Sequence, residues 1–144
     1  MKTCMLCETQ REPVLWRDRS CRIILARDPD HPAFCRVIWS RHVVEMTDLN
    51  PRQRQHLLTV VFTLERVLRS LMAPVKINLA SLGNQVPHLH WHVIPRFADD
   101  AHFPAPIWSP RRRHGVPHAV DVEQLAGTLS AAFARTRRPR IRRT

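Results

Sequence analysis

The sequence predicts an α+β domain in which an antiparallel β-sheet carries one long helix and a short C-terminal helix. Two short apolar stretches of strand length come first, one long amphipathic stretch follows, and two more strand-like segments come after it. This order of strands and helix is typical of an α+β fold with an antiparallel sheet. A chain of 144 residues is long enough for one domain with a sizeable core.

The first two strands are expected to form a hairpin. They cover residues 21–26 and 34–40, and both stretches are largely apolar. The residues between them, Arg27 to Pro32, are rich in Asp and Pro, which is typical of a turn. The second stretch is the more apolar of the two, so we expect it to lie in the centre of the sheet.

A long helix is expected to begin near Pro51. The residues from Thr47 to Asn50 include capping candidates, and a proline suits the first helical turn. Apolar residues then recur at alternating steps of four and three, which predicts one buried stripe. The stripe consists of Leu57, Val61, Leu64, Leu68 and Leu71. Pro74 is expected to end the helix.

A third strand, a turn and a fourth strand are expected next. Residues 75–80 predict the third strand, and residues 81–86 predict the turn, with Gly83 and Asn84 at its tightest point. Residues 96–117 are rich in proline and charge, which indicates an irregular surface segment, and residues 121–135 predict a short helix. We therefore expect a single domain over residues 1–134, followed by a disordered arginine-rich tail over 135–144.

The net charge of +11 suggests a nucleic-acid partner, but its distribution weakens that interpretation. Nine arginines in one loop and in the tail account for most of the excess, and without them the remainder carries only +2. They are Arg111, Arg112, Arg113, Arg135, Arg137, Arg138, Arg140, Arg142 and Arg143. A contact with RNA or an acidic partner is therefore expected only through the tail.

The chain shows neither a signal peptide nor an apolar run long enough to cross a membrane, so no membrane partner is expected. We expect a cytoplasmic protein whose cysteines stay reduced. Metal binding or simple burial is then favoured over disulfides for Cys4, Cys7, Cys21 and Cys35. Cys21 and Cys35 fall within predicted strands and are expected to be small core residues.

Three of the nine histidines stand at every second position in residues 87–95. Because side chains alternate along a strand, His88, His90 and His92 are expected to point to one face, and the apolar residues between them to the other. Such a row is rarely needed for stability, which indicates a role in chemistry.

Two kinds of chemistry suit this row equally well. A neutral imidazole can attack phosphorus and form a phosphohistidine, while neighbouring histidines bind the phosphate oxygens. Alternatively, imidazoles presented by a strand can bind zinc. A row that only packs or faces solvent is the least favoured interpretation.

The segment His-Leu-His-Trp-His-Val-Ile at 88–94 resembles the signature of the histidine-triad (HIT) family. The resemblance extends to the strand with Asn78, to the turn at Gly83, and to the apolar strand before His42, over roughly residues 4–108. It implies a HIT-like antiparallel sheet, a homodimer, and a nucleotide hydrolase or transferase acting at the α-phosphate. Nucleoside phosphoramidates and dinucleoside polyphosphates are the substrates that it implies.

The resemblance also implies a role for each histidine. His90 would be the nucleophile that becomes nucleotidylated, His92 would contact the phosphate, and the backbone carbonyl of His88 would orient His90. The chemical step would need no metal. Two competing hypotheses remain: a zinc-dependent hydrolase with all three histidines as ligands, and a non-enzymatic nucleic-acid-binding protein built around the tail.

The substrate-binding residues follow the family pattern less closely. Asn78, Gly83 and Gln85 would bind the phosphate or the leaving group. However, the turn reads Gly-Asn-Gln where the family usually has Gly-Gln-Ser or Gly-Gln-Thr, so a hydroxyl contact is missing. Asp28 is the nearest counterpart of the ribose-binding acid. Arg96 would approach substrate phosphates, or else form a surface ion pair with Asp99 or Asp100. Trp108 resembles an aromatic residue of the leaving-group pocket or dimer contact, although simple packing is favoured.

Cys4 and Cys7 have the spacing of half a zinc site. Some bacterial members of the family complete such a pair with two histidines, which here would be His42 and His88. The resemblance thus implies a structural zinc that ties the N-terminus to the catalytic strand, although two reduced thiols without metal remain the alternative.

Overall fold

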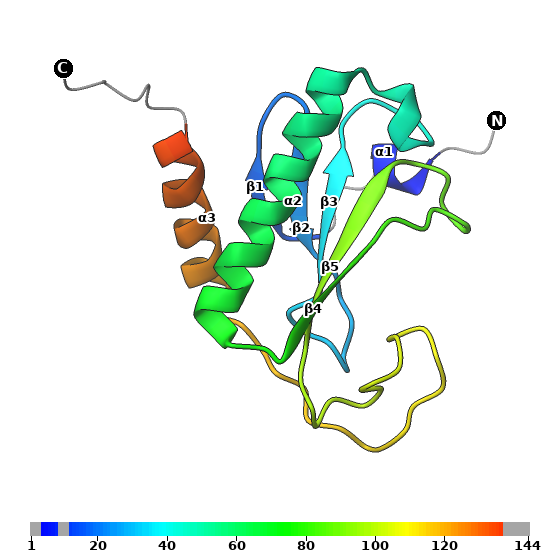
Figure 1. Ribbon diagram of the computed structural model, residues 1–144, viewed down its shortest axis with the longest axis vertical. Coiled ribbons are helices and arrows are strands. Elements are labelled where there is room, and N and C mark those ends of the chain that lie inside the picture. Colours follow the sequence, from blue (N-terminus) through cyan, green and yellow to red (C-terminus); the bar gives the residue numbers. More distant parts are fainter. Residues whose placement is uncertain (1–3, 9–11, 137–144) are drawn as a thin grey trace.

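The computed structural model describes residues 4–8 and 12–136 (Figure 1). An antiparallel five-stranded sheet has the order β1-β2-β3-β5-β4. Its strands are β1 (Val14–Arg17), β2 (Cys21–Leu25), β3 (Cys35–Trp39), β4 (Lys76–Ala80) and β5 (His90–Arg96). The helices are α1 (Met5–Glu8), the 3-10 turn η1 (Met46–Asp48), α2 (Pro51–Met72) and α3 (Val122–Thr136). The predicted α+β class is confirmed, and β1 is an additional edge strand.

Helix α2 begins and ends at the signals that the sequence carries. The Asn50 side chain accepts a hydrogen bond from the backbone N–H of Gln53 at 2.9 Å, and Pro51 occupies the first turn. At the other end, Ala73 adopts a left-handed conformation and its N–H donates to the Arg69 carbonyl at 3.0 Å. Pro74 then prevents the helix from continuing.

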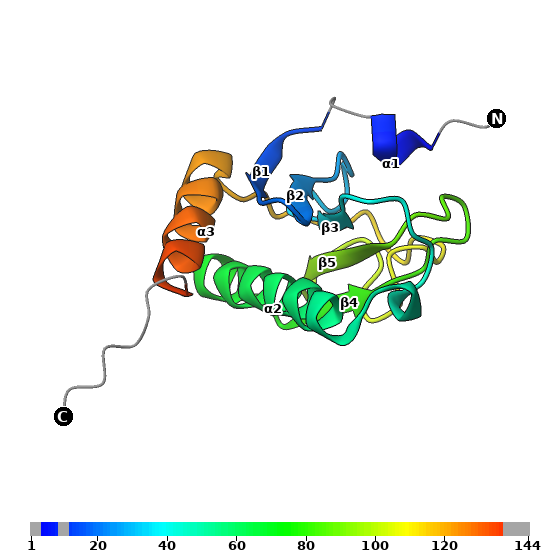
Figure 2. The same cartoon turned by 90° about the horizontal axis from the view of Figure 1, so that it is seen from above.

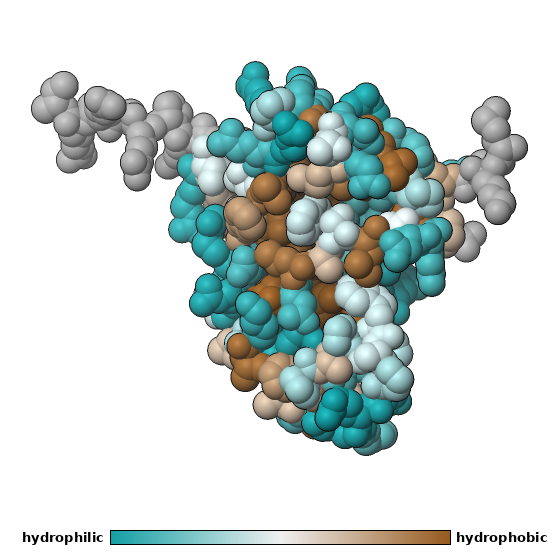
Figure 3. Space-filling model, turned by 45° about the vertical axis from the view of Figure 1, so that its right-hand side comes forward, coloured by the Kyte–Doolittle hydropathy of each residue, from teal (hydrophilic) through white to brown (hydrophobic). Residues whose placement is uncertain are grey.

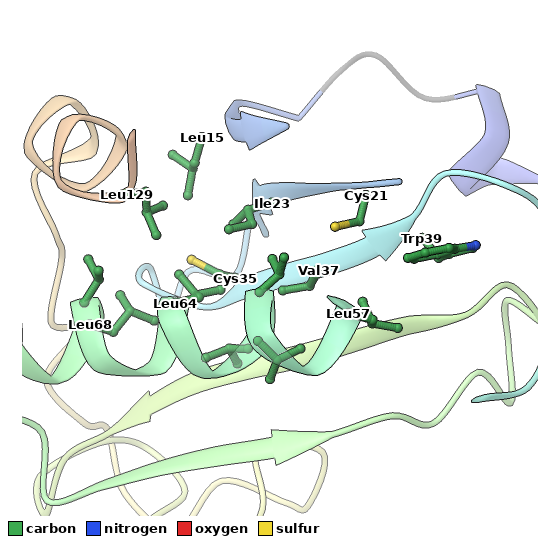
Figure 4. Close-up of a cluster of buried hydrophobic side chains, with 14 of the residues drawn as sticks. Leu15, Cys21, Ile23, Cys35, Val37, Trp39, Leu57, Leu64, Leu68 and Leu129 are labelled. Carbon is green, nitrogen blue, oxygen red and sulfur yellow. The ribbon is translucent and has the colours of Figure 1, made fainter. Parts of the chain in front are cut away.

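Both long helices cover one face of the sheet, with α2 along it and α3 beside α2 and β1 (Figure 2). The main core lies between these two helices and the sheet (Figure 4). It includes Leu15, Ile23, Val37, Leu57, Leu64, Leu68 and Leu129. Cys21 and Cys35 are fully buried there, and burial raises the pKa of the Cys35 thiol to about 12. Both are core residues, as predicted.

The opposite face of the sheet carries a smaller apolar cluster and the polar residues of the site. Leu6 of α1 packs there against Ile24 and Ile38, so the N-terminal segment covers this face near the end of β3. A guanidinium N–H of Arg22 donates to the Leu6 carbonyl at 2.6 Å and fixes α1 on the sheet. The polar residues of the site therefore lie on the face opposite α2 and α3, beside α1 and the loop after β5.

The C-terminal part departs from the predicted boundary. Helix α3 continues to Thr136, past the expected domain end at residue 134. Residues 137–144 of the predicted tail lie outside the described residues. Within the described part of the chain, no helix is long and apolar enough to cross a membrane.

Candidate active site and metal cluster

Strand β5 carries the two central residues of the site. It lies between β3 and β4, and His90 and His92 project from it on the face away from α2. The prediction of three histidines on one strand is correct for these two only, because β5 begins at His90 and His88 lies just before it. The chain turns at His88, and its imidazole faces the N-terminal cysteines.

The ring of His90 is held in one orientation by the residue two positions before it. Its Nδ1 lies 2.6 Å from the His88 carbonyl oxygen, which can only accept, so Nδ1 carries the proton. The lone pair of Nε2 is then free. Burial lowers the pKa of His90, and the imidazole is neutral near pH 7. This is the state that a nucleophile requires.

His92 stands beside His90 and keeps an unused polar atom. The two rings are 4.8 Å apart and nearly perpendicular. The Nδ1 atom of His92 is buried and has no hydrogen-bond partner within the described part of the chain. Burial lowers the pKa of His92 to about 4. The ring of Trp108, which is half exposed, lies 5.1 Å from that of His92, so Trp108 borders the site.

Arg36 belongs to the same site, and the sequence analysis missed it. On β3 it lies directly opposite His92, and its guanidinium lies over the Phe34 ring at 5.2 Å. Its positive charge lowers the pKa values of both His90 and His92, after the larger effect of burial. A sequence signal existed, since Arg36 is the only charged residue within the otherwise apolar stretch 34–39.

The turn between β4 and β5 has the predicted backbone. Gly83 has φ of 73°, the left-handed conformation that favours glycine, whereas the side chain of Gln85 is exposed. The turn lacks the serine or threonine that the family usually has after its glycine, but Ser81 at its start supplies another hydroxyl, which the sequence pattern did not single out. Ser81 Oγ donates to the His90 carbonyl at 2.9 Å and so fixes the backbone of the candidate nucleophile.

The guanidinium of Arg96 is buried and bonded to other groups of the protein, which disfavours the predicted direct contact with substrate phosphates. Arg96 is 1% exposed and its guanidinium donates to both carboxylate oxygens of Asp100, at 2.8 and 3.0 Å. It also donates to Asn78 Oδ1 at 2.7 Å and to the Ala105 carbonyl at 2.8 Å. The ion pair with Asp100 is present, but it is buried rather than on the surface. Its bond to Asn78 fixes the amide of a predicted phosphate-binding residue.

Asp28 lies in the turn between β2 and β3 and is partly buried. Its Oδ1 accepts hydrogen bonds from the backbone N–H groups of Asp30 and His31, at 2.9 and 3.0 Å, which orients the carboxylate. The negative charge of Asp28 favours the charged form of Arg36, against the larger effect of burial, which lowers the pKa of that guanidinium.

The four predicted metal ligands meet at one point. Cys4, Cys7, His42 and His88 bring their sulfur and nitrogen atoms within 4.8 Å of one another. The Nδ1 atom of His88 is 3.4 Å from both sulfur atoms, and the Nδ1 atom of His42 is 3.4 Å from the Cys7 sulfur. The packing of α1 on the sheet thus brings Cys4 and Cys7 to the residue just before β5.

This donor set fits zinc. Tetrahedral zinc with its usual bond lengths to sulfur and nitrogen separates those ligand atoms by about 3.5 Å, close to the distances found here. The other ring nitrogen of His88, Nε2, lies 2.6 Å from the Trp39 carbonyl oxygen and donates to it. Nδ1 then carries no proton and is available to bind a metal. A zinc-bound histidine usually donates its other ring N–H to a carbonyl or carboxylate in this way.

Two other groupings are less suited to a metal. Asp100, which lies near His31 and His102, already accepts hydrogen bonds from Arg96 with both oxygens. Cys21, near Asp18 and His56, is a fully buried thiol whose pKa is raised by burial. The three histidines of the row do not form a ligand group among the described residues. The hypothesis that all three bind a catalytic zinc therefore does not fit the geometry.

Comparisons with known proteins agree with this geometry. A histidine triad protein from Bradyrhizobium japonicum is 28% identical with a TM-score of 0.67, and the match covers 85% of this chain and 89% of that one. A histidine triad protein from Marinobacter aquaeolei is also 28% identical with a TM-score of 0.67, covering 86% and 90%. A zinc-bound histidine triad family protein from Mycobacterium smegmatis, 24% identical with a TM-score of 0.60 and covering 93% and 95%, shares the fold.

Among curated proteins, an AP-4-A phosphorylase from Mycobacterium tuberculosis is 30% identical over 96 residues, or 62% of this chain and 49% of that protein. The chain thus spans about half the length of the curated relatives it matches. The family model for the HIT domain matches residues 8–99, which include β1 to β5, α2 and the three histidines. This chain belongs to the HIT domain family.

Proposed function

We propose that this protein is a nucleotide hydrolase that cleaves its substrate at the α-phosphate through a covalent intermediate on His90. The orientation of this ring carries the proposal. Because Nδ1 donates to the His88 carbonyl, Nε2 keeps its lone pair, and the ring stands beside His92 on the face of the sheet that also carries Arg36. A neutral, oriented imidazole is suited to attack phosphorus.

In the first step, the Nε2 atom of His90 forms a bond to the α-phosphorus as the P–O or P–N bond to the leaving group breaks. The leaving group departs with the bonding electron pair and takes up a proton. In the second step, water attacks the same phosphorus, the P–N bond to His90 breaks, and a nucleoside monophosphate and a proton are released. Catalysis then depends mainly on positioning and on stabilising charge at the phosphoryl oxygens.

Family membership and the similarity to AP-4-A phosphorylase support a nucleotide-processing enzyme. We propose dinucleoside polyphosphates and nucleoside phosphoramidates as substrates. His92, the amide of Asn78, the turn at Gly83 and Gln85 would contact the phosphates, and the carboxylate of Asp28 would contact the ribose. Because the relative is named a phosphorylase, inorganic phosphate is the alternative acceptor, and it would release a nucleoside diphosphate.

The test is His90→Asn, assayed with adenosine phosphoramidate and diadenosine tetraphosphate, with and without inorganic phosphate. We expect hydrolysis to fall by at least about 1000-fold, because the asparagine amide is no nucleophile. The matched control is His114→Asn, which changes an exposed loop histidine and should leave the rate unchanged. Undiminished turnover by His90→Asn would exclude the covalent mechanism.

We also propose that Cys4, Cys7, His42 and His88 hold a structural zinc ion. The ion would tie α1 to the residue that orients His90, and the chemical step would not require it. The close approach of the four ligand atoms supports this, as does the zinc-bound structural neighbour from Mycobacterium smegmatis. Metal analysis of the purified protein should find about one zinc per chain, and Cys4→Ala together with Cys7→Ala should abolish it.

A homodimer is proposed as well. Strand β4 is an edge of the sheet in the described part of the chain, and an edge strand offers backbone groups to which a second copy can add a strand. Phe62 on α2 and Val75 just before β4 are large apolar residues that are about half exposed. Apolar residues form a band across the middle of the surface in the view of Figure 3. Light scattering should give twice the chain mass, and Phe62→Lys should shift it toward the monomer.

We also propose a cytoplasmic location, where cysteines stay reduced, since none of the four described cysteines forms a disulfide. Contact between the arginine-rich tail and RNA or an acidic partner concerns residues of which 137–144 lie outside the described part. Deleting residues 135–144 should remove any polynucleotide binding and preserve hydrolysis. That outcome would make the tail an accessory to the enzyme, whereas polynucleotide binding by a full-length protein that hydrolyses neither substrate would favour a nucleic-acid-binding protein instead.

A further inference from the structure

We propose that Arg36 binds the substrate directly, with its guanidinium on a phosphate of the nucleotide held at His90 and His92. This inference rests on the proposed function, because it assumes that a nucleotide occupies this face of the sheet. It adds to the site a cation that comes from β3 rather than from the histidine strand or from the turn before it.

The position of Arg36 carries the first part of the argument. Arg36 is paired with His92 across β3 and β5, so the two side chains leave neighbouring strands on the same face. Phe34, which lies just before β3 and two residues before Arg36, has its ring 5.4 Å from the His92 ring and 5.2 Å from the guanidinium carbon of Arg36. The charged group is thus held over the site by an aromatic ring instead of extending into solvent.

Unused hydrogen-bonding capacity carries the second part. Arg36 Nε and His92 Nδ1 are the two buried side-chain polar atoms that lack a partner within the described part of the chain. A buried polar group without a partner destabilises the protein, so two of them on facing residues need an explanation. A phosphate between the two strands would explain both, because its oxygens accept from Arg36 Nε and, when His92 Nδ1 is protonated, from that atom too.

A comparison with Arg22 shows that this arrangement is specific to Arg36. Arg22 lies on the same face of the sheet, on β2, and donates to the Leu6 carbonyl at 2.6 Å. Its role is to hold α1 in place. Arg36 forms no ion pair among the described residues; Glu12 and Asp28 act on it only at a distance.

The charge of the site points to an anionic ligand. Burial lowers the pKa of His92 to about 4, so its ring adds no fixed positive charge near pH 7. Arg36 is charged at any physiological pH and is planar, with donors that match phosphate oxygens. It therefore supplies a permanent cation beside the phosphorus that His90 would attack, which is the place where catalysis of phosphoryl transfer needs it.

The experiment measures the binding of AMP and of adenosine by calorimetry, in the wild-type protein, Arg36→Met and Arg36→Lys. We expect Arg36→Met to weaken AMP binding by at least tenfold while adenosine binding changes less than twofold. Arg36→Lys, which keeps the charge but not the planar fork, should be intermediate. The matched control is Arg69→Met, which removes one exposed positive charge from α2 on the other face and should change neither affinity.

Other outcomes would overturn the inference. Equal weakening of AMP and adenosine would mean that Arg36 contacts the nucleoside and not the phosphate, and unchanged binding of both would exclude any contact. The readout is separate from that of the proposed function, because AMP binding requires no turnover. A wild-type protein that binds AMP but hydrolyses nothing would refute the hydrolase and leave the role of Arg36 measurable. A wild-type protein that does not bind AMP would overturn the role of Arg36.

Discussion

The two ends of the histidine segment are fixed in different ways. At the start, His88 is held by the Trp39 carbonyl and faces Cys4, Cys7 and His42, the other proposed zinc ligands. At the far end, Arg96 is held by Asp100 in a buried ion pair with two direct hydrogen bonds. The candidate catalytic pair, His90 and His92, lies between these two anchors.

The difference indicates that the two anchors respond to different conditions. The Arg96 anchor is formed by hydrogen bonds and an ion pair between protein groups. Besides those from Arg96, the Asp100 carboxylate accepts hydrogen bonds from the backbone N–H groups of Phe97, His102 and Phe103. The His88 anchor depends on reduced thiols and, in our proposal, on zinc. Changes that affect one anchor and not the other should therefore separate their contributions.

The largest effect is expected from breaking the Arg96 anchor. Arg96→Met leaves the Asp100 carboxylate buried without its cation, and removing one partner of a buried pair typically costs about 3–5 kcal/mol. Denaturation by urea should show this loss in the free energy of unfolding. The exposed Arg69→Met should change it by less than about 0.5 kcal/mol. A loss below about 1 kcal/mol for Arg96→Met would mean that this end is not an anchor.

Acid should weaken the same anchor to a smaller extent. The hydrogen bonds from Arg96 and from three backbone N–H groups hold the pKa of Asp100 well below its usual value of 3.8. The stability that it contributes is therefore fully present above about pH 4 and is lost as the pH falls further. Unfolding measured between pH 6 and pH 3 should show this decrease, and Asp100→Asn should flatten it. An identical slope in both proteins would exclude Asp100 as its source.

Chelation at pH 7 should weaken only the His88 anchor. A ligand present at 100 times its dissociation constant stabilises a protein by about 2.7 kcal/mol, so removal of zinc at that saturation should cost about that amount. A chelator titration followed by thermal unfolding measures it. Cys7→Ser should start at the lower stability and respond no further. Equal sensitivity of both proteins would contradict a zinc ion at this cluster.

Two glycines outside the anchors are expected to respond in opposite directions, and the change at Gly127 should be the smallest effect. Gly115 has φ of 79°, and an added Cβ would lie 2.5 Å from the Ala101 backbone nitrogen, so Gly115→Ala should destabilise by about 1–3 kcal/mol. Gly127 in α3 has open space around its Cα, and Gly127→Ala should stabilise by about 0.5–1 kcal/mol. Thermal unfolding should show a lower melting temperature for Gly115→Ala and a higher one for Gly127→Ala. Equal shifts in the two variants would argue against close packing of the loop on Ala101.

The elements with strong local signals were predictable from the sequence. Helix α2 begins at Pro51 and ends before Pro74, and β2 pairs with β3 as the predicted hairpin. His88 and the cysteines meet as the family resemblance implied. Strand β1 was missed because its four residues pair only with β2 and show no clear alternation. Short edge strands of this kind depend on their partner for stability rather than on their own sequence.

Tertiary contacts account for the remaining differences. Arg96 follows the triad closely and was a reasonable phosphate ligand, but the loop after β5 folds back and brings Asp100 and the Ala105 carbonyl to it. Arg36 was part of an apolar strand, and only the pairing of β3 with β5 shows that it faces His92. Periodicity identifies the face to which a residue points, but it does not identify the neighbour across the sheet.

The place of β5 in the sheet has a consequence for local unfolding. β5 is hydrogen-bonded to β3 on one side and β4 on the other, whereas β1 and β4 each form an edge. The backbone amides of His90 to Val93 should therefore exchange with deuterium among the slowest in the protein, and those of β1 among the fastest of the sheet. The residue proposed to form the covalent intermediate thus sits where the chain opens least often, so its geometry persists while the loops around it move.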